Sequence, residues 1–282
     1  MKQLLLSISF YMITLLGICQ IPVVSSGKII RLENFQSQFI TARNIDIWLP
    51  DGFSKSKKYD VLYMHDGQML FDSSTTWNHQ SWEVDEVIGK LLKEKKIRDL
   101  IVVGIWNGGT TRHGDYFPQK PFESLTKVQQ DTLYGSNRPA GTSIFNDVKV
   151  KSDGYLKFIV TELKPYIDQN YPTRKGRKST FIAGSSMGGL ISVYAICEYP
   201  KIFGGAACLS THWPGVFAME NNPVPAAFMA YLKTRLPDPS THRIYFDYGT
   251  GTLDAMYPPL QKEVDLLMIE HAAIAKRAVD RK

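Results

Sequence analysis

One serine in this chain lies in a sequence pattern that can make its hydroxyl a nucleophile. Residues 184–188 read G-S-S-M-G, which fits the pattern G-x-S-x-G with Ser186 at its centre. A strand-like, β-branched run (178–183) precedes the pattern, and an apolar run at helical spacing (190–198) follows it. On such a strand-to-helix turn the serine oxygen stands exposed above the sheet edge, and the glycines allow the tight turn. We therefore predict that Ser186 is the nucleophile of a serine hydrolase.

A serine hydroxyl needs a general base, which is usually a histidine oriented by a carboxylate. In α/β-hydrolases the acid follows the nucleophile along the chain and precedes the histidine. Asp254 fits this order, because it lies in a glycine-rich loop after the strand-like run 243–248. Asp247 is a second candidate within that run, and an ordinary turn aspartate is the alternative interpretation of Asp254.

An oxyanion hole needs two hydrogen-bond donors aimed at the oxygen that becomes negative during the reaction. The first candidate is the backbone N–H of Met187, directly after the nucleophile. The second lies after the short apolar run 60–64, where Gly67 allows a sharp turn and Gln68 supplies the N–H. We therefore predict that the amides of Met187 and Gln68 form the oxyanion hole.

Composition and charge favour an ordinary globular protein over several other classes. The chain has 282 residues and a net charge of +6 with both signs interspersed, and it contains no nucleic-acid-binding motif. No cysteine–histidine spacing of a zinc site occurs. His65 and Asp66 are neighbours without further ligands, so we interpret them as loop structure. We expect no metal and no cofactor.

The first 26 residues are typical of an export signal. One lysine precedes an apolar run (4–24) that ends in small residues, so we expect cleavage near Ser26 and Gly27, leaving residues 27–282 as one secreted or periplasmic domain. An uncleaved membrane anchor is the alternative, and no other segment could cross a membrane. Cleavage would leave Cys197 and Cys208, which we expect as buried thiols rather than a disulfide.

Strand-like and helix-like segments alternate along the rest of the chain. This order predicts an α/β fold with a doubly wound, mostly parallel sheet, in which ligands bind at the carboxyl ends of the strands. We expect residues 112–141 to be an excursion with little regular structure and residues 213–239 to be a lid. The expected strands are 28–34, 38–49, 60–64, 100–106, 178–183, 205–210 and 243–248, and the expected helices are 81–97, 153–169, 190–198 and 260–279.

Five segments together resemble the putative esterase family of α/β-hydrolases. That family includes enterochelin esterases, S-formylglutathione hydrolases, feruloyl and acetylxylan esterase domains, and mycolyltransferases. The resemblance covers about residues 27–267 and implies the α/β-hydrolase fold, with Ser186 as nucleophile, Asp254 as acid and the Gln68 and Met187 amides as oxyanion donors. The segments are VLYMHDGQMLFD (61–72), IVVGIWN (101–107), DYFP (115–118), FIAGSSMGGLISVYA (181–195) and YFDYGTGTLD (245–254).

The chain departs from this family at its end. Members normally continue into a final strand and a loop that carries the catalytic histidine, whereas this chain stops at Lys282. His271 shares the apolar face of the last expected helix, so we interpret it as structural. We expect a C-terminally truncated fold that lacks its final strand and exposes a sheet edge, which invites aggregation. His65, His212 and Trp213 are candidates for substrate contact.

The leading hypothesis is an exported esterase that hydrolyses carboxylic esters through an acyl-serine. The missing histidine motivates a second hypothesis, a non-catalytic (pseudoenzyme) binding homologue. Acyl transfer to a sugar or lipid hydroxyl is a third. The expected substrates are small esters, either sugar-linked or siderophore esters, and four tryptophans could line a pocket or fill the core.

Overall fold

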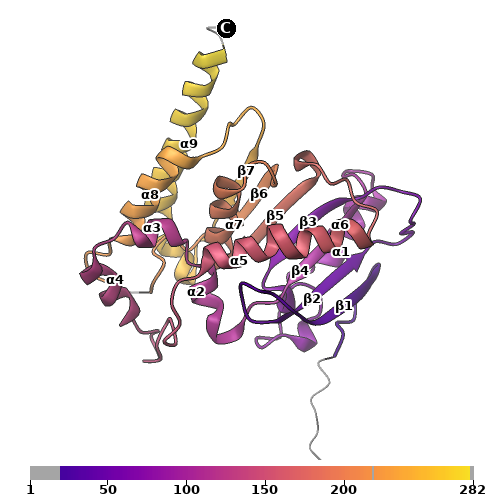
Figure 1. Ribbon diagram of the computed structural model, residues 1–282, viewed down its shortest axis with the longest axis horizontal. Helices are drawn as coiled ribbons and strands as arrows, with labels where there is room; N and C mark the ends of the chain where they lie inside the picture. The colour runs from indigo at the N-terminus through magenta and orange to yellow at the C-terminus, as the bar shows by residue number, and fades with distance from the viewer. Residues whose placement is uncertain (1–19, 218, 280–282) are drawn as a thin grey trace, which may run out of the picture.

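The computed structural model describes residues 20–217 and 219–279. In this part of the chain, strands form a single sheet in the order β1-β2-β4-β3-β5-β6-β7 (Figure 1). β1 and β2 pair antiparallel, as do β2 and β4, and the remaining neighbours are parallel. The predicted α/β fold with a mostly parallel sheet is confirmed. The strands are β1 Lys28–Phe35, β2 Arg43–Leu49, β3 Asp60–His65, β4 Leu100–Ile105, β5 Thr180–Ser185, β6 Gly205–Leu209 and β7 Arg243–Asp247.

The central strands bury both of their faces. Because successive side chains point to opposite faces, Val61 and Tyr63 of β3 enter one core while Leu62 and Met64 enter the other. The larger core lies under α5 (Ser152–Phe158), α6 (Lys164–Asn170) and α7 (Met187–Glu198), and α1 (Val84–Lys93) covers the smaller one. This two-sided burial explains the continuous apolar runs from which these strands were predicted.

The excursion at residues 112–141 is more regular than expected. It contains α2 (Arg112–Tyr116), α3 (Gln119–Glu123) and α4 (Lys127–Tyr134), so the expectation of little regular structure is wrong. α4 begins with a capping box between Thr126 and Gln129. These helices are too short to show a helical period, and aromatic packing holds them in place. The packed rings are Phe117, Phe122, Tyr134 and Phe145.

The remaining helical segments agree with the predicted order. Residues 152–170 run as α5, a π-helical turn η4 (Ile159–Leu163) and α6. The predicted lid region contains α8 (Val224–Arg235), which packs on α3 and α9 (Pro258–Val279). The short 3-10 turns are η1 Gly67–Met69, η2 Ser73–Thr75, η3 Gly109–Thr111, η5 Arg177–Ser179 and η6 Thr252–Met256. None of the helices in the described part of the chain is long and apolar enough to cross a membrane.

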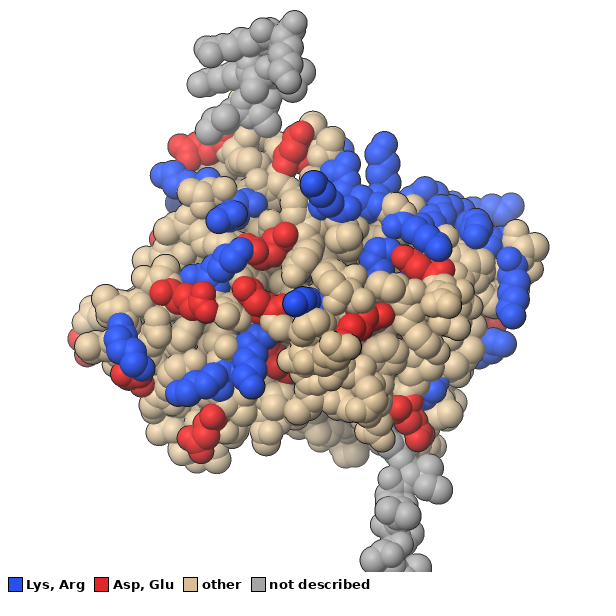
Figure 2. Space-filling view, in the orientation of Figure 1, with Lys and Arg blue, Asp and Glu red and all other residues tan. Residues whose placement is uncertain are grey.

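β7 lies at the edge of the sheet, next to β6. Within the described residues, η6 and α9 follow β7 and no further strand does, and the last turns of α9 project beyond the body (Figure 1). Tyr245 of β7 is 58% exposed. Cys197 and Cys208 are buried free thiols, as predicted. On the face in Figure 2 acidic and basic side chains are interspersed, with Lys and Arg gathering toward the upper right.

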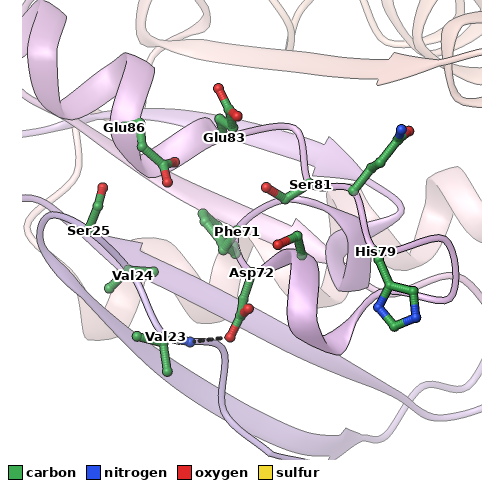
Figure 3. Close-up of a pocket in the computed structure, with 11 residues that line it drawn as sticks. Val23, Val24, Ser25, Phe71, Asp72, His79, Ser81, Glu83 and Glu86 are labelled. Carbon is green, nitrogen blue, oxygen red and sulfur yellow. Dashed lines mark hydrogen bonds between the residues drawn. The ribbon is translucent and has the colours of Figure 1, made fainter.

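The predicted export signal lies mostly outside the described residues. Its last residues, however, pack on the body of the protein. The Val23 N–H donates to Asp72 at 2.9 Å, and these two residues form part of the wall of a surface hollow of about 700 Å³ (Figure 3). Ser25 donates to the buried Asp85 through its N–H at 2.6 Å and its hydroxyl at 2.9 Å. Residues 23–26 therefore contribute to the folded surface.

Candidate active site

Ser186 is the single residue between the end of β5 and the start of α7. Its backbone has φ 59° and ψ −118°, a left-handed φ that a non-glycine residue rarely adopts. A Cβ on Gly184 would come within 2.9 Å of the Gly188 backbone, so the turn requires this glycine. The geometry is that of the strand-to-helix turn predicted from the G-x-S-x-G pattern.

Ser186 opens into a cavity of about 170 Å³ at the carboxyl ends of the parallel strands. The structure brings three predicted residues together here, namely Ser186, Met187 and His212. The sequence analysis missed the rest of the wall, which is supplied largely by the excursion and by the loops after β6 and β7. These further residues are Gly109, Arg112, His113, Arg138, Phe217 and Leu253.

His212 is the histidine that the fold places beside Ser186. Its backbone N–H donates to the Ser186 carbonyl oxygen at 3.2 Å, and its ring Nδ1 lies 2.8 Å from the hydroxyl oxygen of Tyr257. Burial lowers the pKa of His212 to about 4, because charging a buried imidazole costs solvation. A hydrogen bond to the Val216 backbone and the charge of Asp254 act in the opposite direction, while Arg112 lowers the pKa further. The ring is therefore neutral near pH 7.

Tyr257 lies directly before α9 and was not singled out in the sequence. Its side chain is fully buried, and its hydroxyl oxygen lies 2.8 Å from Nδ1 of His212. Burial and the nearby Asp254 raise the pKa of Tyr257 to about 12, and the neighbouring Ser186 side chain opposes this rise. The phenol is thus protonated at neutral pH and has both the histidine and the serine as neighbours.

Asp254 lies in η6, in the predicted loop after β7. A catalytic acid would be hydrogen-bonded to a histidine, but Asp254 has other partners. Its Oδ2 accepts hydrogen bonds from the Ser210 hydroxyl at 2.7 Å and from the Gly249 N–H at 2.6 Å. No histidine in the described part of the chain is hydrogen-bonded to it. His271, the histidine after Asp254 in the chain, contacts the Pro237 carbonyl oxygen through Nε2 at 2.9 Å, which agrees with the structural role predicted for it.

The predicted oxyanion loop adopts the expected sharp turn. The backbone of Asp66 adopts the left-handed helical conformation. A Cβ on Gly67 would lie 2.5 Å from the Gly104 backbone, so a glycine is required there. Gln68 lies in η1, where its side-chain oxygen accepts the Asn107 N–H at 3.2 Å. The cavity lining includes Met187 but not Gln68. The role of the Gln68 amide as an oxyanion donor stays a prediction.

A buried ion pair connects this loop to the cavity wall. Arg112 donates two hydrogen bonds of 2.7 Å to Asp66, and Asn107 adds a third of the same length. Burial raises the pKa of Asp66, but the charge and hydrogen bonds of Arg112 outweigh it, so the pKa is lowered. Asp66 is thus a carboxylate that holds Arg112 in the wall of the cavity.

Two candidates for substrate contact lie outside the cavity lining. His65 is buried, with Nδ1 2.7 Å from the Tyr155 hydroxyl, and burial lowers its pKa to about 3. Trp213 is fully buried and donates its indole N–H to Gln261 at 2.9 Å. Both side chains are therefore buried and hydrogen-bonded within the protein and do not line the cavity.

Sequence comparison agrees with this geometry. The family model described as "Putative esterase" matches residues 37–260. The chain belongs to this esterase family. The curated relatives of this esterase-family chain include YbbA of Bacillus subtilis, 25% identical over 74% of this chain and 68% of the relative. An endo-1,4-beta-xylanase/feruloyl esterase of Xylanibacter ruminicola is 22% identical over 66% of this chain and 22% of that protein.

Solved structures show the same fold. A ferulic acid esterase has a TM-score of 0.57 and 18% identity, with 89% of this chain and 88% of that chain covered. The enterobactin esterase FES of Shigella flexneri has a TM-score of 0.54 and 18% identity, over 92% of this chain and 53% of that one. The esterase-family chain thus spans about half of the Shigella enzyme and less than a quarter of the Xylanibacter protein.

Proposed function

We propose that this chain is an exported serine esterase that hydrolyses carboxylic esters through an acyl-serine intermediate. The observation that carries the proposal is Ser186 in the wall of the cavity, with its backbone at a strained, positive φ. Strain of this kind is found where it positions a reacting group. Membership of the esterase family supports the same reaction.

In this reaction the Ser186 oxygen attacks the ester carbonyl carbon and the alcohol leaves, after which water releases the acid. The Met187 N–H, at the start of α7, is the donor nearest in sequence to the developing oxyanion. The amino end of a helix also favours negative charge. The neutral His212 ring is available as a proton acceptor, since burial keeps its pKa low.

The cavity favours an ester with a small, partly polar acyl group. A volume of about 170 Å³ is close to that of an engineered protein cavity that holds one benzene ring. Phe217 and Leu253 supply apolar walls, whereas Arg138 and His113 supply polar ones. A hydroxylated aromatic acyl group matches both kinds of wall. Two of the similar solved structures are a ferulic acid esterase and an enterobactin esterase, which supports this class of substrate.

The test compares purified wild-type protein with Ser186→Ala on p-nitrophenyl acetate and on methyl ferulate. We expect the wild type to hydrolyse both esters, and the variant to lose most of its rate. Equal rates for the two proteins would remove Ser186 from the mechanism. Hydrolysis of the acetate alone would leave the esterase in place and reject the aromatic acyl group.

A second candidate function is a non-catalytic binding homologue. The arrangement of Asp254 favours it, because this carboxylate is hydrogen-bonded to Ser210 and Gly249 instead of to a histidine. A fluorophosphonate probe separates the two functions, because only an activated serine reacts with it. Stoichiometric labelling of the wild type, absent in Ser186→Ala, supports the esterase, and an unlabelled wild type supports the binding homologue.

Export remains part of the proposal. The cleavage expected near Ser26 and Gly27 would remove both of the hydrogen bonds that Ser25 donates to the buried Asp85. We therefore propose an exported form that keeps Ser25, in place of that cleavage position. Expression in a host with a secretion pathway, followed by N-terminal sequencing of the exported protein, tests this. We expect a mature chain that begins before Val23. A mature chain beginning at Gly27 would show that these contacts are dispensable.

A further inference from the structure

We propose that Tyr257 carries the proton of Ser186 to His212, so that a serine–tyrosine–histidine relay does the work usually done by a histidine alone. The proposal rests on the serine esterase function proposed above. Ser186, before α7, and His212, after β6, line the cavity, and Tyr257, before α9, contacts His212 from outside the lining.

One hydrogen bond and one neighbouring side chain define the proposed row. The Tyr257 hydroxyl oxygen lies 2.8 Å from Nδ1 of His212, and the Ser186 side chain is a neighbour of the same hydroxyl. Tyr257 and His212 are both almost fully buried, so water does not compete for this bond. A phenol oxygen can accept one hydrogen bond while its own O–H donates another, which is what a relay between two partners needs.

The proposal assigns the proton of the neutral His212 ring to Nε2. The Val216 backbone is a neighbour of the ring that favours a proton on it. A neutral imidazole that donates one N–H to a carbonyl keeps its other nitrogen as an acceptor. Nδ1 then accepts from Tyr257, whose oxygen is left to accept from the Ser186 hydroxyl.

Two protons move in the proposed first step. Attack of the Ser186 oxygen on the ester carbon breaks the serine O–H bond and passes its proton to Tyr257. The proton of Tyr257 moves in the same step to Nδ1 of His212, which leaves a neutral tyrosine, an imidazolium and a tetrahedral oxyanion. When the intermediate collapses, the protons return along the same row to the leaving alcohol oxygen, and water takes the place of that alcohol in the second half of the reaction.

The titratable groups around His212 come from two elements and one further residue. Arg112 and His113 lie in α2, Asp254 lies in η6, and Tyr257 lies directly before α9. The charge of Asp254 favours the imidazolium, whereas Arg112 opposes it. Asp254 is therefore a positioning residue that acts on His212 through its charge and anchors the loop through Ser210 and Gly249.

The experiment measures kcat/KM for p-nitrophenyl acetate across about pH 3 to 9, the range that brackets histidine titration. The proteins are the wild type, Tyr257→Phe, His212→Asn and the double variant, with Ser186→Ala and the exposed Tyr248→Phe as controls. Phenylalanine keeps the ring packing and removes the hydroxyl, and asparagine keeps an acceptor for Tyr257 that cannot be protonated. Folding of each variant is checked by circular dichroism.

We expect Tyr257→Phe and His212→Asn each to lower kcat/KM by about 10²–10⁴-fold, the usual contribution of a general base. The double variant should be no slower than either single one, because the two residues act as a unit. Tyr248→Phe should leave the rate unchanged. The wild type should keep its rate well below pH 6 and lose it as His212 becomes protonated near its pKa of about 4. His212→Asn should lack this acid limb.

Three results would overturn the relay. They are a Tyr257→Phe rate within about threefold of the wild type, additive losses in the double variant, and an acid limb near pH 6.5 that persists in His212→Asn. The wild-type pH profile tests the relay even if a variant does not fold. If Tyr257→Phe keeps the wild-type kcat/KM and Ser186→Ala is inactive, only the relay is rejected. If Ser186→Ala keeps the wild-type kcat/KM, the esterase assignment itself is rejected.

Discussion

The backbone N–H of His212 donates a hydrogen bond of 3.2 Å to the carbonyl oxygen of Ser186. The Ser186 N–H in turn donates to the Leu209 carbonyl oxygen at 2.9 Å. The end of β6 and the loop after it are therefore hydrogen-bonded to the N–H and the carbonyl oxygen of Ser186. These bonds hold Ser186 at its positive φ and position His212 in the wall of the same cavity.

Asp254→Asn should slow ester hydrolysis by only about tenfold. An acid that orients a histidine directly is worth about 10⁴-fold, whereas Asp254 acts on His212 through its charge and through the loop it anchors. The measurement is kcat on p-nitrophenyl acetate. Asp247→Asn is the matched control, because Asp247 contacts the same loop through the Ser210 N–H and should change the rate little. A loss near 10⁴-fold would show that Asp254 is a direct triad acid.

The free energy of unfolding should fall as the pH drops from about 6.5 toward 4. His65, His113 and His212 are buried and neutral, and burial lowers their pKa values to about 3, 3 and 4. Their unfolded pKa is near 6.5, so the unfolded chain binds more protons in this interval and is favoured there. The contribution of these neutral histidines to the free energy of unfolding is therefore fully present above about pH 6.5 and is lost as the pH falls toward about 4. Urea unfolding at pH 7, 5 and 4 measures the trend, and a flat profile between pH 7 and 5 would contradict it.

His65→Gln should remove part of this acid sensitivity, because glutamine can keep a hydrogen bond to Tyr155 without ever being charged. The slope of unfolding free energy against pH between about pH 6.5 and 4 should therefore be shallower than in the wild type. Replacing the exposed His79 by Gln is the matched control and should leave the slope unchanged. An unchanged slope in His65→Gln would mean that this histidine is already protonated in the folded protein.

Ser25→Ala should destabilise the protein by about 1–3 kcal/mol. The substitution removes the hydroxyl bond to the carboxylate of Asp85, which is fully buried, and leaves only the Ser25 N–H as a donor from this residue. Urea unfolding of the full chain measures the change, with Ser56→Ala at an exposed loop position as the control. Equal stability of the two variants would mean that the Ser25 hydroxyl contributes no folding energy.

Tyr245→Lys should reduce self-association. Tyr245 is exposed on β7, the strand at the sheet edge, where an apolar surface invites pairing with another chain and a lysine discourages it. Light scattering after size-exclusion chromatography, at several protein concentrations, measures the effect. Val128→Lys is the matched control, because Val128 is an exposed apolar residue on α4, away from the sheet edge. The same reduction in both variants would assign the effect to net charge and not to the edge.

The sequence predicts best what depends on local pattern. The continuous apolar runs at β3 and β4 and the turn at Ser186 were all predicted, because burial on both faces and a tight turn leave direct marks in the sequence. The short helices α2 and α3 were not predicted from the sequence. They are too short to show a helical repeat of apolar residues, and aromatic packing holds them in place.

The partners of Ser186 were harder to predict, because they are distant from it and from one another in the sequence. His212 and Tyr257 are 45 positions apart and belong to different elements, so only the folded chain shows that they meet. Asp254 was correctly placed in the loop after β7, yet its hydrogen-bond partners depend on how that loop packs against Ser210. Such long-range pairings leave no periodic signal in a single sequence.

The most direct test of the central claim is the capture of an acyl group on Ser186. Wild-type protein and Ser186→Ala are mixed with p-nitrophenyl acetate, quenched with acid within the first turnover, digested and analysed by mass spectrometry. We expect an acetyl group on the wild-type peptide that contains Ser186, with a matching loss of hydrolysis in the variant. An unmodified Ser186 peptide, together with equal hydrolysis by the two proteins, would contradict the assignment of Ser186 as the nucleophile.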